Sequence, residues 1–409
     1  MERQILHVDV NNAFLSWTAI DMLKNGSNID IREIPAIIGG DESKRSGIVL
    51  AKSMKAKECG IKTAETIYQA RIKCPNLSIF PSNFEIYREY SNKLYNLLLE
   101  YTDKIERFSI DECFLDLTNY LMKSTLLEKG KEINNRVKEE LGFTVNVGVA
   151  NNKLLAKMAS DFKKPDRVHT LFKEEIPKKM WPLPISELFM LGKRTVPKLY
   201  NMQIKTIGDL AKADKNILIK KFGKHGLMIW EYANGIDNAE VKYIKEKPKC
   251  IGNSITLPED IRDREKIEEI ILALTEQVTF RLRRHKMLAG VVNVQLRTNN
   301  FVDTSHQRKL INTTASTKEI YIQAKGLLKQ MYKEGMPIRL VGLRVDGLVD
   351  EDNRQISLFD SETNEESRKQ EKLDKTIDRL KEKYGYNFIT RAGKMEVDNM
   401  IKFRKDEVK

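Results

Sequence analysis

The sequence predicts an α+β protein of several domains. A chain of 409 residues is too long for one hydrophobic core and fits two to four domains, and 41% of its residues are hydrophobic. Strand-like and helix-like segments alternate over the first 170 residues. From residue 251 the expected order is strand, helix, strand, strand, helix, strand, which is typical of a four-stranded sheet with two helices on one face.

The composition favours an anionic partner. The formal net charge is +13, from 71 basic and 58 acidic residues, and nucleic acid is the partner that this charge suggests first. No segment reaches the roughly eighteen uncharged apolar residues of a membrane span, and no signal peptide precedes the first strand. Four cysteines lie far apart in the sequence without metal-ligand spacing: Cys59, Cys74, Cys113 and Cys250. We expect reduced thiols in a cytoplasmic protein without membrane association.

The first expected elements are a strand at Ile5–Val10 and a helix that begins after the turn Asn11-Asn12. Asp9 falls near the end of the strand, where side chains leave the core. A strand end followed by a helix start also frees backbone N–H groups that can bind a phosphate. His7 is interpreted as an ordinary strand residue rather than as a ligand.

Residues 25–80 are expected to form a small substructure. Strands at 34–40 and 45–51 precede a helix at 53–58, which ends at a glycine. The lysines around this helix could hold a triphosphate or form a solvated face, and the local sequence favours the solvated face: Lys52, Lys55 and Lys57.

The alternation of helices and strands continues to residue 170. Apolar residues at helical spacing predict helices at 84–103, 126–141 and 153–162, and residues 144–150 are expected to form a strand. Asn152 is expected to cap the last of these helices.

An acidic pair interrupts the apolar segment 106–117. Apolar residues on both faces predict a strand that is buried on both sides, yet Asp111 and Glu112 lie next to each other inside it. Buried carboxylates are costly unless a cation such as Mg²⁺ neutralises them, whereas two acids at an exposed strand end would need no ligand. Adjacent strand residues point to opposite faces, so a shared site requires a strand end or a bulge just after Ser109. With Asp9, this pair could hold two Mg²⁺ ions and align a hydroxyl with a triphosphate.

Three segments resemble the motifs of the Y-family (translesion) DNA polymerases, the group that contains bacterial DNA polymerase IV. They are His7–Phe14, Ser109–Glu112 and Gly148–Lys157 with Lys164-Pro165, in the order and spacing of the family. The resemblance extends from residue 5 to about residue 360. It implies a right-hand polymerase with a palm, small fingers, a helix-hairpin-helix thumb and a little finger. It also implies template-directed addition of dNTPs to a primer 3′ end, at low fidelity and without proofreading, in DNA repair.

The resemblance assigns roles to the residues of the first motifs. Asp9, Asp111 and Glu112 match the carboxylates that hold two Mg²⁺ ions, and the backbone carbonyl of Val10 would complete one metal shell. Phe14 matches the steric gate, the ring that excludes a 2′-hydroxyl, although plain helix core is the alternative.

Further matches concern the incoming nucleotide. Ser53, Lys57 and Lys164 match positions that contact the triphosphate. Two positions depart from the family pattern. Met54 replaces a tyrosine that donates to a phosphate, and Lys57 replaces an arginine, so the charge stays but the bidentate fork is lost.

The segment 185–199 is expected to fold as helix, tight turn and helix. It resembles the helix-hairpin-helix of the family's thumb, whose turn N–H groups bind DNA phosphates without reading sequence. Met190 replaces the usual first glycine of this turn. The predicted DNA contacts here are Gly192, Lys193 and Arg194.

Basic residues are frequent in the expected little finger. Residues 241–345 contain 20 Lys or Arg and 11 Asp or Glu, a net charge of 20 − 11 = +9. We expect one basic face that contacts DNA phosphates rather than scattered solvated charges. Its predicted members are Arg281, Arg283, Arg284, Lys286, Arg297, Arg308 and Lys309.

The expected domains and the tail follow from these segments. The domains are the palm (1–22 and 81–170), fingers (23–80), thumb (171–240), linker (241–249), little finger (250–347) and a flexible tail (348–409). In the tail, Gln355, Leu358 and Phe359 belong to a segment that resembles the sliding-clamp docking motif of bacterial polymerases. A short basic helix at 373–384 has no assigned role.

Three functions are compared at this point. The first is a translesion DNA polymerase that acts as a cytoplasmic monomer on primer-template DNA and dNTPs. The second is a clamp-bound scaffold without catalysis, which need not keep all three carboxylates. The third is a metal-dependent nuclease or lyase, which would degrade DNA without dNTPs. The lesions bypassed, the effect of Met54 and Lys57, and a need for accessory subunits stay open.

Overall fold

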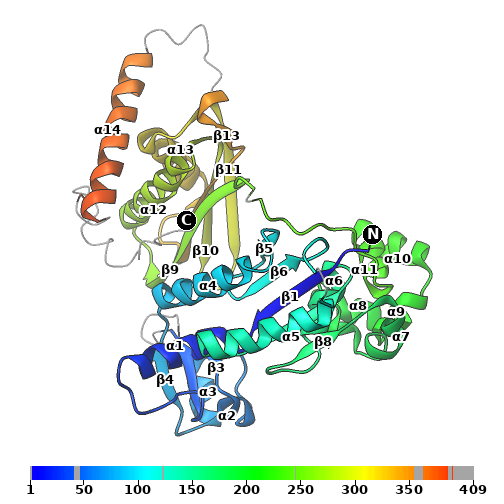
Figure 1. Cartoon of the computed structure of the whole chain (residues 1–409). Coiled ribbons are helices and arrows are strands. Elements are labelled where there is room, and N and C mark those ends of the chain that lie inside the picture. The colour runs from blue at the N-terminus through cyan, green and yellow to red at the C-terminus, as the bar shows by residue number, and fades with distance from the viewer. Residues whose placement is uncertain are drawn as a thin grey trace. The chain divides into compact units, whose positions relative to one another are not determined.

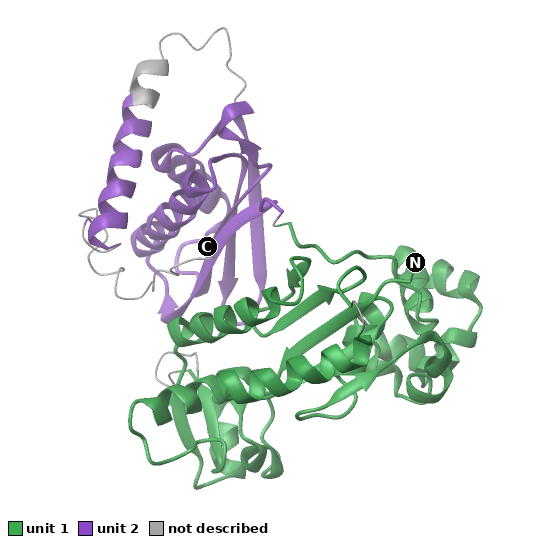
Figure 2. Cartoon of the chain, in the orientation of Figure 1, with its two compact units in different colours: residues 1–42, 46–245 green, residues 43–45, 246–409 purple. Residues whose placement is uncertain are grey.

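The computed structural model describes residues 2–40, 47–121, 124–244, 246–353, 363–385 and 389. The chain forms two compact units (Figure 2). The first comprises residues 1–42 and 46–245, and the second comprises residues 43–45 and 246–409. The boundary between them falls in the segment that the sequence predicts as a linker.

The main sheet of the first unit has five strands with β1 at its centre. Its order is β5 (Ile105–Arg107), β6 (Glu112–Asp116), β1 (Ile5–Val10), β7 (Val145–Ala150) and β8 (Val168–Thr170). Neighbouring strands are antiparallel except for β7 and β8. Every residue of β1 and β7 is buried, which confirms the predicted apolar strands at both positions.

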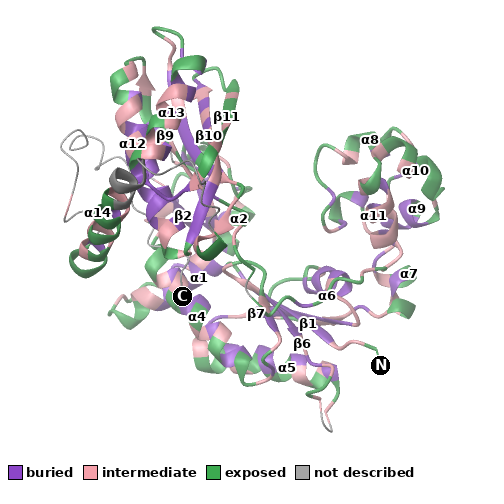
Figure 3. Ribbon diagram, turned by 90° about the horizontal axis from the view of Figure 1, so that it is seen from above, coloured by how far each residue is buried: buried purple, intermediate pink, exposed green. Residues whose placement is uncertain are grey.

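Helices cover both faces of this sheet. Leu6, Val8 and Val10 share one buried cluster with residues of α1 (Ala13–Lys24), α4 (Phe84–Leu99) and α5 (Leu126–Arg136). The opposite face packs on α6 (Lys153–Ser160), and Figure 3 shows α5 and α6 on opposite sides of β1. A short π-helix, Val137–Leu141, continues α5.

A glycine lets α6 approach the sheet closely. A Cβ atom added to Gly148 on β7 would lie 1.8 Å from the backbone carbonyl oxygen of Ala156 and 2.7 Å from the Ser160 nitrogen. Only glycine therefore permits this distance between helix and strand. The side chain of Asn152 accepts a hydrogen bond from the Leu155 N–H and caps α6, as the sequence predicts.

A second, smaller sheet lies in the same unit. Its order is β3 (Val49–Lys52), β2 (Ala36–Gly39) and β4 (Ser78–Pro81), and α2 (Met54–Glu58) and α3 (Ile67–Lys73) pack with it (Figure 1). The predicted strands and the first helix are present, and Gly60, with φ 79°, follows that helix.

Short helices complete the first unit. They are η3 (Lys173–Glu175), α7 (Ile176–Lys179), η4 (Ile185–Glu187), α8 (Val196–Tyr200), α9 (Ile207–Lys212), α10 (Lys215–Phe222) and α11 (Lys224–Ala233). The first helix of the predicted hairpin is thus only a 3₁₀ turn. In the turn, Met190 has φ 65°, a left-handed conformation that glycine adopts without strain, in line with the expectation of a less ideal turn.

The second unit confirms the predicted strand and helix order. Its elements are β9 (Cys250–Ile261), α12 (Arg264–Arg284), β10 (Met287–Thr298), β11 (Asp303–Thr314), α13 (Thr317–Met331) and β12 (Ile338–Asp346). The antiparallel sheet has the order β11-β10-β12-β9, with β13 (Val349–Asp350) paired to β10. Helices α12 and α13 lie on the same face (Figure 1).

The described part of the tail is ordered. After the 3₁₀ turn η5 (Glu351–Asn353), α14 spans Thr363–Tyr384 and packs on α12. The short helix predicted at 373–384 is thus the second half of a longer helix. Buried ion pairs with α12 hold this helix, and the local sequence does not reveal them.

Charged side chains attach α14. Arg283 on α12 contacts Asp378 through two nitrogens, at 2.6 and 2.8 Å, and lies 3.6 Å from Asp374. Asp374 also accepts a hydrogen bond from the Thr317 N–H, and Lys381 lies 3.3 Å from Glu276. We call Arg283, Asp374, Asp378, Glu276 and Lys381 the tail cluster.

Candidate active site

Two carboxylates lie side by side on the main sheet of the first unit. Asp9 on β1 and Glu112 on β6 are paired directly across the antiparallel ladder, so both side chains project to the same face. Phe114 follows Glu112 by two residues on β6 and therefore points to the same face. It belongs to the same buried cluster as α6, so α6 covers this face. Asp9 is only 5% exposed.

Asp111 lies in the turn between β5 and β6. Its carboxylate accepts a hydrogen bond from the Ser109 hydroxyl (2.6 Å), and its backbone carbonyl accepts one from the Val10 N–H (3.0 Å). The segment 106–117 is thus a hairpin, and the prediction of one continuous strand is wrong. The requirement for a strand end is met, because Glu112 is the first residue of β6.

Two lysines approach these carboxylates. The Lys157 ammonium on α6 lies 3.0 Å from Asp9 Oδ2 and 3.2 Å from Glu112 Oε1. The Lys164 ammonium lies 3.0 Å from the same Asp9 oxygen. We call Asp9, Asp111, Glu112, Lys157 and Lys164 the carboxylate cluster. The sequence motif Gly148–Lys157 already contains Lys157, but its spacing alone does not show this contact.

The pKa values of two of the carboxylates are shifted in opposite directions. Burial alone would raise the pKa of Glu112, but His7 and the Lys157 ammonium outweigh burial and lower this pKa to about 2. Burial raises the pKa of Asp111, and the charges of Asp9 and Glu112 raise it further, against the opposing hydrogen bond from Ser109. Glu112 is therefore held as an anion, whereas ionised Asp111 is poorly compensated.

His7 is more than a plain strand residue. It is fully buried, its Nδ1 lies 2.8 Å from the Ser160 hydroxyl, and its Nε2 lies 3.6 Å from Glu112 Oε2. Burial lowers the pKa of His7, against the hydrogen bond with Glu112, which raises it. Its place two residues before Asp9, on the same face of β1, is the signal from which this contact could have been predicted.

The carboxylate cluster has oxygen donors for a metal ion, but lysine occupies part of the site. Among the residues that the structure describes, no group of three His, Cys, Asp or Glu side chains is arranged to hold one. In the cluster, the Lys157 ammonium is shared by Asp9 and Glu112, the place where a cation would bridge them. The donors are nevertheless all carboxylate oxygens, which suit Mg²⁺, and within the described ranges no Lys or Arg pairs with Asp111. The donor set fits a divalent cation that displaces lysine.

The predicted nucleotide contacts differ in their surroundings. Ser53 is 1% exposed and caps α2; its hydroxyl donates to the Ile34 carbonyl and accepts from the N–H groups of Ala36 and Ala56. One donor and two acceptor positions are all that a hydroxyl has, so the predicted side-chain contact of Ser53 with a triphosphate is not available here.

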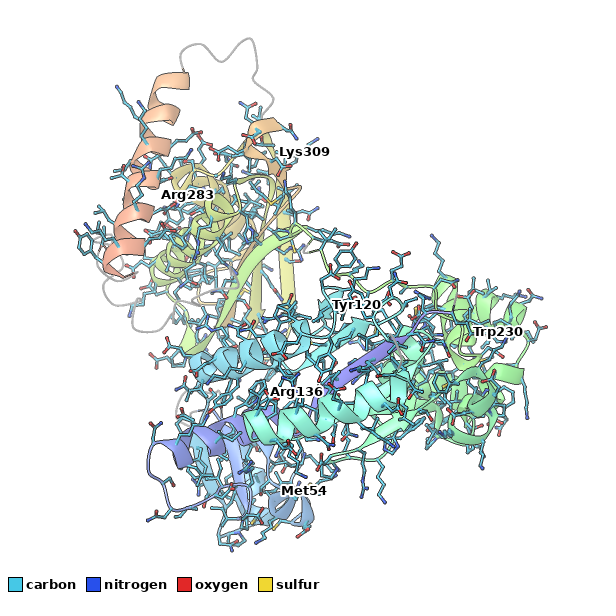
Figure 4. The ribbon with its side chains drawn as sticks, in the orientation of Figure 1. Met54, Tyr120, Arg136, Trp230, Arg283 and Lys309 are labelled. Carbon is cyan, nitrogen blue, oxygen red and sulfur yellow. The ribbon has the colours of Figure 1, made fainter. Side chains whose placement is uncertain are left out.

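The lysines beside Ser53 fit an anion better than the solvated face that the local sequence favours. Burial lowers the pKa of Lys52, and the nearby charge of Lys57 lowers it further. Two ammonium groups that repel each other gain from a bound phosphate. Met54, beside them on α2, is 51% exposed and points outward (Figure 4).

Phe14 is half-buried at the start of α1. Its ring stacks on Tyr87 at 4.6 Å between centroids and meets Phe84 edge-on at 5.9 Å. The expected free N–H groups nearby are partly used, since the Asn11 N–H donates to the Thr144 carbonyl. The gate role of Phe14 stays a prediction.

The turn before α8 exposes backbone donors. Gly192, Lys193 and Arg194 are exposed, and their N–H groups donate to no acceptor among the described residues. Consecutive free N–H groups beside two basic side chains form a surface that suits a phosphate.

The basic residues of the second unit do not form one face, so that prediction is wrong. Arg308 pairs with buried Val292 and points to the helix-covered face, where it contacts Gln323 of α13 at 3.1 Å. Arg283 lies between α12 and α14 in the tail cluster, whereas Lys309 lies on the sheet (Figure 4). Cross-strand pairing decides this split, because neighbouring strand residues alternate between faces.

Three of the remaining basic residues have partners in the chain. Arg281 donates to the Gly252 carbonyl, Arg284 lies 3.7 Å from Glu382, and Arg297 forms an ion pair with Asp303 at 2.8 Å. A hollow of about 460 Å³ opens beside Arg281 on this sheet. Its lining is polar and basic and includes Ser254, Asn293, Gln295, Arg281 and Arg344. Sequence reasoning did not identify Arg344.

Two family comparisons cover most of the chain. A profile of the impB/mucB/samB family matches residues 8–161, and a profile of the C-terminal domain of the same family matches residues 248–358. DNA polymerase IV of Clostridium acetobutylicum is 50% identical over 396 residues, which cover 97% of this chain and 99% of the relative. The chain belongs to the Y family of DNA polymerases. DNA polymerase IV 1 of Bacillus subtilis is 34% identical and covers 96% of this chain and 94% of the relative.

A solved structure has the same fold. A Y-family DNA polymerase chimera matches with a TM-score of 0.72 and 24% identity, over 85% of this chain and 99% of the chimera. The predicted fold class, an α+β protein of several domains, is thus confirmed.

One prediction finds no answer in the described residues. The docking motif with Gln355, Leu358 and Phe359 lies outside them. No helix among those described is long and apolar enough to cross a bilayer.

Proposed function

We propose that this Y-family polymerase extends a primer 3′ end with dNTPs under the direction of a template. The observation that carries the proposal is the carboxylate cluster. Asp9 and Glu112 are cross-strand neighbours, and Asp111 lies in the turn beside them. Such a set of carboxylates suits nucleotidyl transfer, in which the primer hydroxyl attacks the α-phosphate and pyrophosphate leaves.

The proposed cofactor is a pair of Mg²⁺ ions. Asp9, Asp111, Glu112 and the Val10 carbonyl would hold them. When bound, the ions stabilise the attacking and leaving oxygens of the displacement. Lys157 would then turn from Asp9 and Glu112 toward the phosphates, because the metal would neutralise two of its three carboxylate partners, Asp9 and Glu112 but not Asp161.

The surfaces around the site suggest where substrates bind. Lys52, Lys57 and Lys164 would contact the triphosphate, and Phe14 would exclude ribonucleotides. The turn at Gly192–Arg194 would hold DNA phosphates in the proposed thumb (171–240), as would the open sheet face in the proposed little finger (250–347). The palm (1–22 and 81–170) and fingers (23–80) keep their predicted limits as part of the proposal.

The cellular role follows from the family. Low fidelity without proofreading, in translesion synthesis during DNA repair, is the role that Y-family membership supports. We propose a monomer that works on the bacterial chromosome in the cytoplasm and docks on the sliding clamp through Gln355, Leu358 and Phe359.

Primer extension on undamaged and damaged templates tests the proposal. Wild-type enzyme should extend a primer in Mg²⁺ with dNTPs, and Asp111→Asn and Glu112→Gln should not, while DNA binding stays intact. Asp378→Asn, in the tail cluster, is the matched carboxylate control and should extend normally. DNA binding without extension in the wild type would favour the scaffold, and DNA degradation without dNTPs would favour a nuclease.

A further inference from the structure

The small sheet of the first unit brings two free thiols into contact. Cys59 follows α2 and Cys74 follows α3, and their Sγ atoms are 3.2 Å apart although fifteen residues separate them in the chain. Cys74 belongs to the buried cluster around α3, and the partly buried Cys59 packs against it. We propose that Cys59 and Cys74 form a reversible disulfide when the enzyme meets a hydroperoxide. The sulfur atoms need to approach by only about 1 Å to reach bonding distance.

The two thiols have unequal access to solvent. Cys59 is partly exposed, whereas Cys74 is 2% exposed and donates a hydrogen bond to Asn76 Oδ1 (3.3 Å). Burial raises the pKa of Cys74, and the neighbouring Cys59 raises it further. A hydroperoxide therefore reaches Cys59 first, and Cys74 is the resolving thiol.

The reaction balances with the hydroperoxide as the only oxidant. Cys59 attacks the peroxide, its sulfur gains one oxygen as sulfenic acid, and the peroxide O–O bond breaks to release water or an alcohol. The Cys74 sulfur then attacks the sulfenic sulfur, the S–S bond forms, the S–O bond breaks, and the proton of Cys74 leaves with the oxygen as water. A dithiol reductant reverses the reaction.

The other two cysteines serve as internal controls. Cys113 is buried on β6 with 5% exposure, so peroxide does not reach its thiol in the folded protein. Cys250 is exposed at the start of β9 in the second unit. No other cysteine of the described second unit lies beside it, so Cys250 can form a sulfenic acid but no disulfide within that unit.

The disulfide would act on the nucleotide contacts, an effect that rests on the proposed function. Cys59 follows Lys57 by two residues, and the loop closed by the bond contains Thr63, whose hydroxyl accepts a hydrogen bond from Lys52 (3.1 Å). A shift of about 1 Å at the end of α2 displaces both ammonium groups from the triphosphate. The KM for dNTPs should rise at least threefold, and kcat should stay within twofold.

Mass spectrometry of the alkylated protein and of its peptides tests the bond without any assay of activity. A Cys250→Ser variant is treated with hydrogen peroxide, denatured, alkylated and digested. We expect two fewer alkyl groups than in the untreated protein, a cross-linked peptide pair containing Cys59 and Cys74, and recovery of both thiols with dithiothreitol. Cys59→Ser in the same background should show no cross-link. Oxidation of Cys59 to sulfinic acid with Cys74 still alkylated would overturn the proposal.

Steady-state kinetics tests the consequence. Peroxide should raise the KM for dNTPs in Cys250→Ser, dithiothreitol should restore it, and Cys59→Ser should not respond. A complete disulfide with an unchanged KM would overturn the link to nucleotide binding. Failure of the reduced enzyme to extend primers would refute the proposed function, whereas the mass measurement would still decide on the disulfide.

Discussion

The carboxylate cluster and the tail cluster are built from the same kinds of side chain but are completed differently. In the tail cluster, Arg283 bonds Asp378 through two nitrogens, and Asp374 has both Arg283 and the Thr317 N–H. In the carboxylate cluster, Asp9 and Glu112 share Lys157, Asp9 also contacts Lys164, and only a hydroxyl serves the Asp111 carboxylate among the described residues.

This difference separates a structural ion-pair network from a site that is prepared for a ligand. A bidentate arginine fixes geometry and stays charged, whereas lysine is a flexible point charge that another cation can replace. The pKa of Asp111 is raised, first by burial and then by Asp9 and Glu112, whereas that of Glu112 is lowered to about 2, so the cations of the carboxylate cluster compensate Glu112 but not Asp111. Such divergent pKa values are typical of functional sites.

Asp111→Asn gives the largest expected effect on activity. The substitution keeps shape and removes one metal ligand, so primer extension should fall at least about a thousandfold, equivalent to about 4 kcal/mol of transition-state stabilisation. The free energy of unfolding should not decrease, because a poorly compensated buried charge is removed. Extension within tenfold of wild type would refute the metal role.

Lys157→Met removes a cation from the carboxylate cluster. Methionine fills the volume of the buried lysine stem but leaves Glu112 and Asp9 without their shared ammonium. Stability without metal should fall by about 3 kcal/mol, the order expected for a broken buried ion pair. Saturating Mg²⁺ should raise the free energy of unfolding more in the variant than in the wild type, and urea unfolding measures both values. An equal increase would contradict the idea that lysine and metal replace each other.

Glu112→Gln tests how the stability of the carboxylate cluster depends on pH. Because the pKa of Glu112 in the folded protein is about 2, below its ordinary value of 4.5, ionised Glu112 stabilises the fold above that ordinary value. This contribution, up to about 3 kcal/mol, is lost as pH falls from 4.5 toward 2. The difference in unfolding free energy between wild type and Glu112→Gln should therefore shrink between pH 5 and pH 3. A constant difference over this range would show that Glu112 has an ordinary pKa.

Arg283→Met breaks the tail cluster. We expect the free energy of unfolding to fall by about 2 kcal/mol. This loss is smaller than for an ion pair that cannot reach solvent, because α14 can detach and rehydrate its carboxylates. Hydrogen exchange should rise in α14 while basal primer extension per folded molecule stays unchanged. A loss of extension would mean that the tail cluster also has a catalytic role.

Arg284→Met is the matched control and should have the smallest effect. Arg284 lies next to Arg283 but only 3.7 Å from the half-exposed Glu382. Exposed pairs contribute about 0–1 kcal/mol, so stability should change by less than about 1 kcal/mol. A loss as large as that of Arg283→Met would refute the distinction between the two arginines.

The sequence predicts most of the local structure and part of the site. Strand β1, helix α6 with its Asn152 cap and the whole order of the second unit could be predicted, because apolar periodicity and caps are local properties. The pairing of Asp9 with Glu112 could not, because it depends on the register between β1 and β6. Side-chain alternation in strands was enough to predict that the acidic pair lies at a strand end, and Glu112 is the first residue of β6.

Other features depend on contacts between distant segments. The buried hydroxyl of Ser53, the opposite orientations of Arg308 and Lys309, and the contact of Cys59 with Cys74 are set by packing. The docking of α14 likewise depends on pairs between Arg283 and the tail, more than ninety residues away. In each case a side chain that looks solvated or reactive in the sequence has a partner in the fold.

Mn²⁺ binding tests the central claim most directly, because Mn²⁺ replaces Mg²⁺ at oxygen sites and is visible in electron paramagnetic resonance. The wild-type complex with primer-template DNA and a non-reactive dNTP analogue should bind two Mn²⁺ ions at the carboxylate cluster, as a two-metal mechanism requires. Asp111→Asn should lose at least one of them, and Asp378→Asn should lose none. Equal Mn²⁺ binding by wild type and Asp111→Asn would contradict the account.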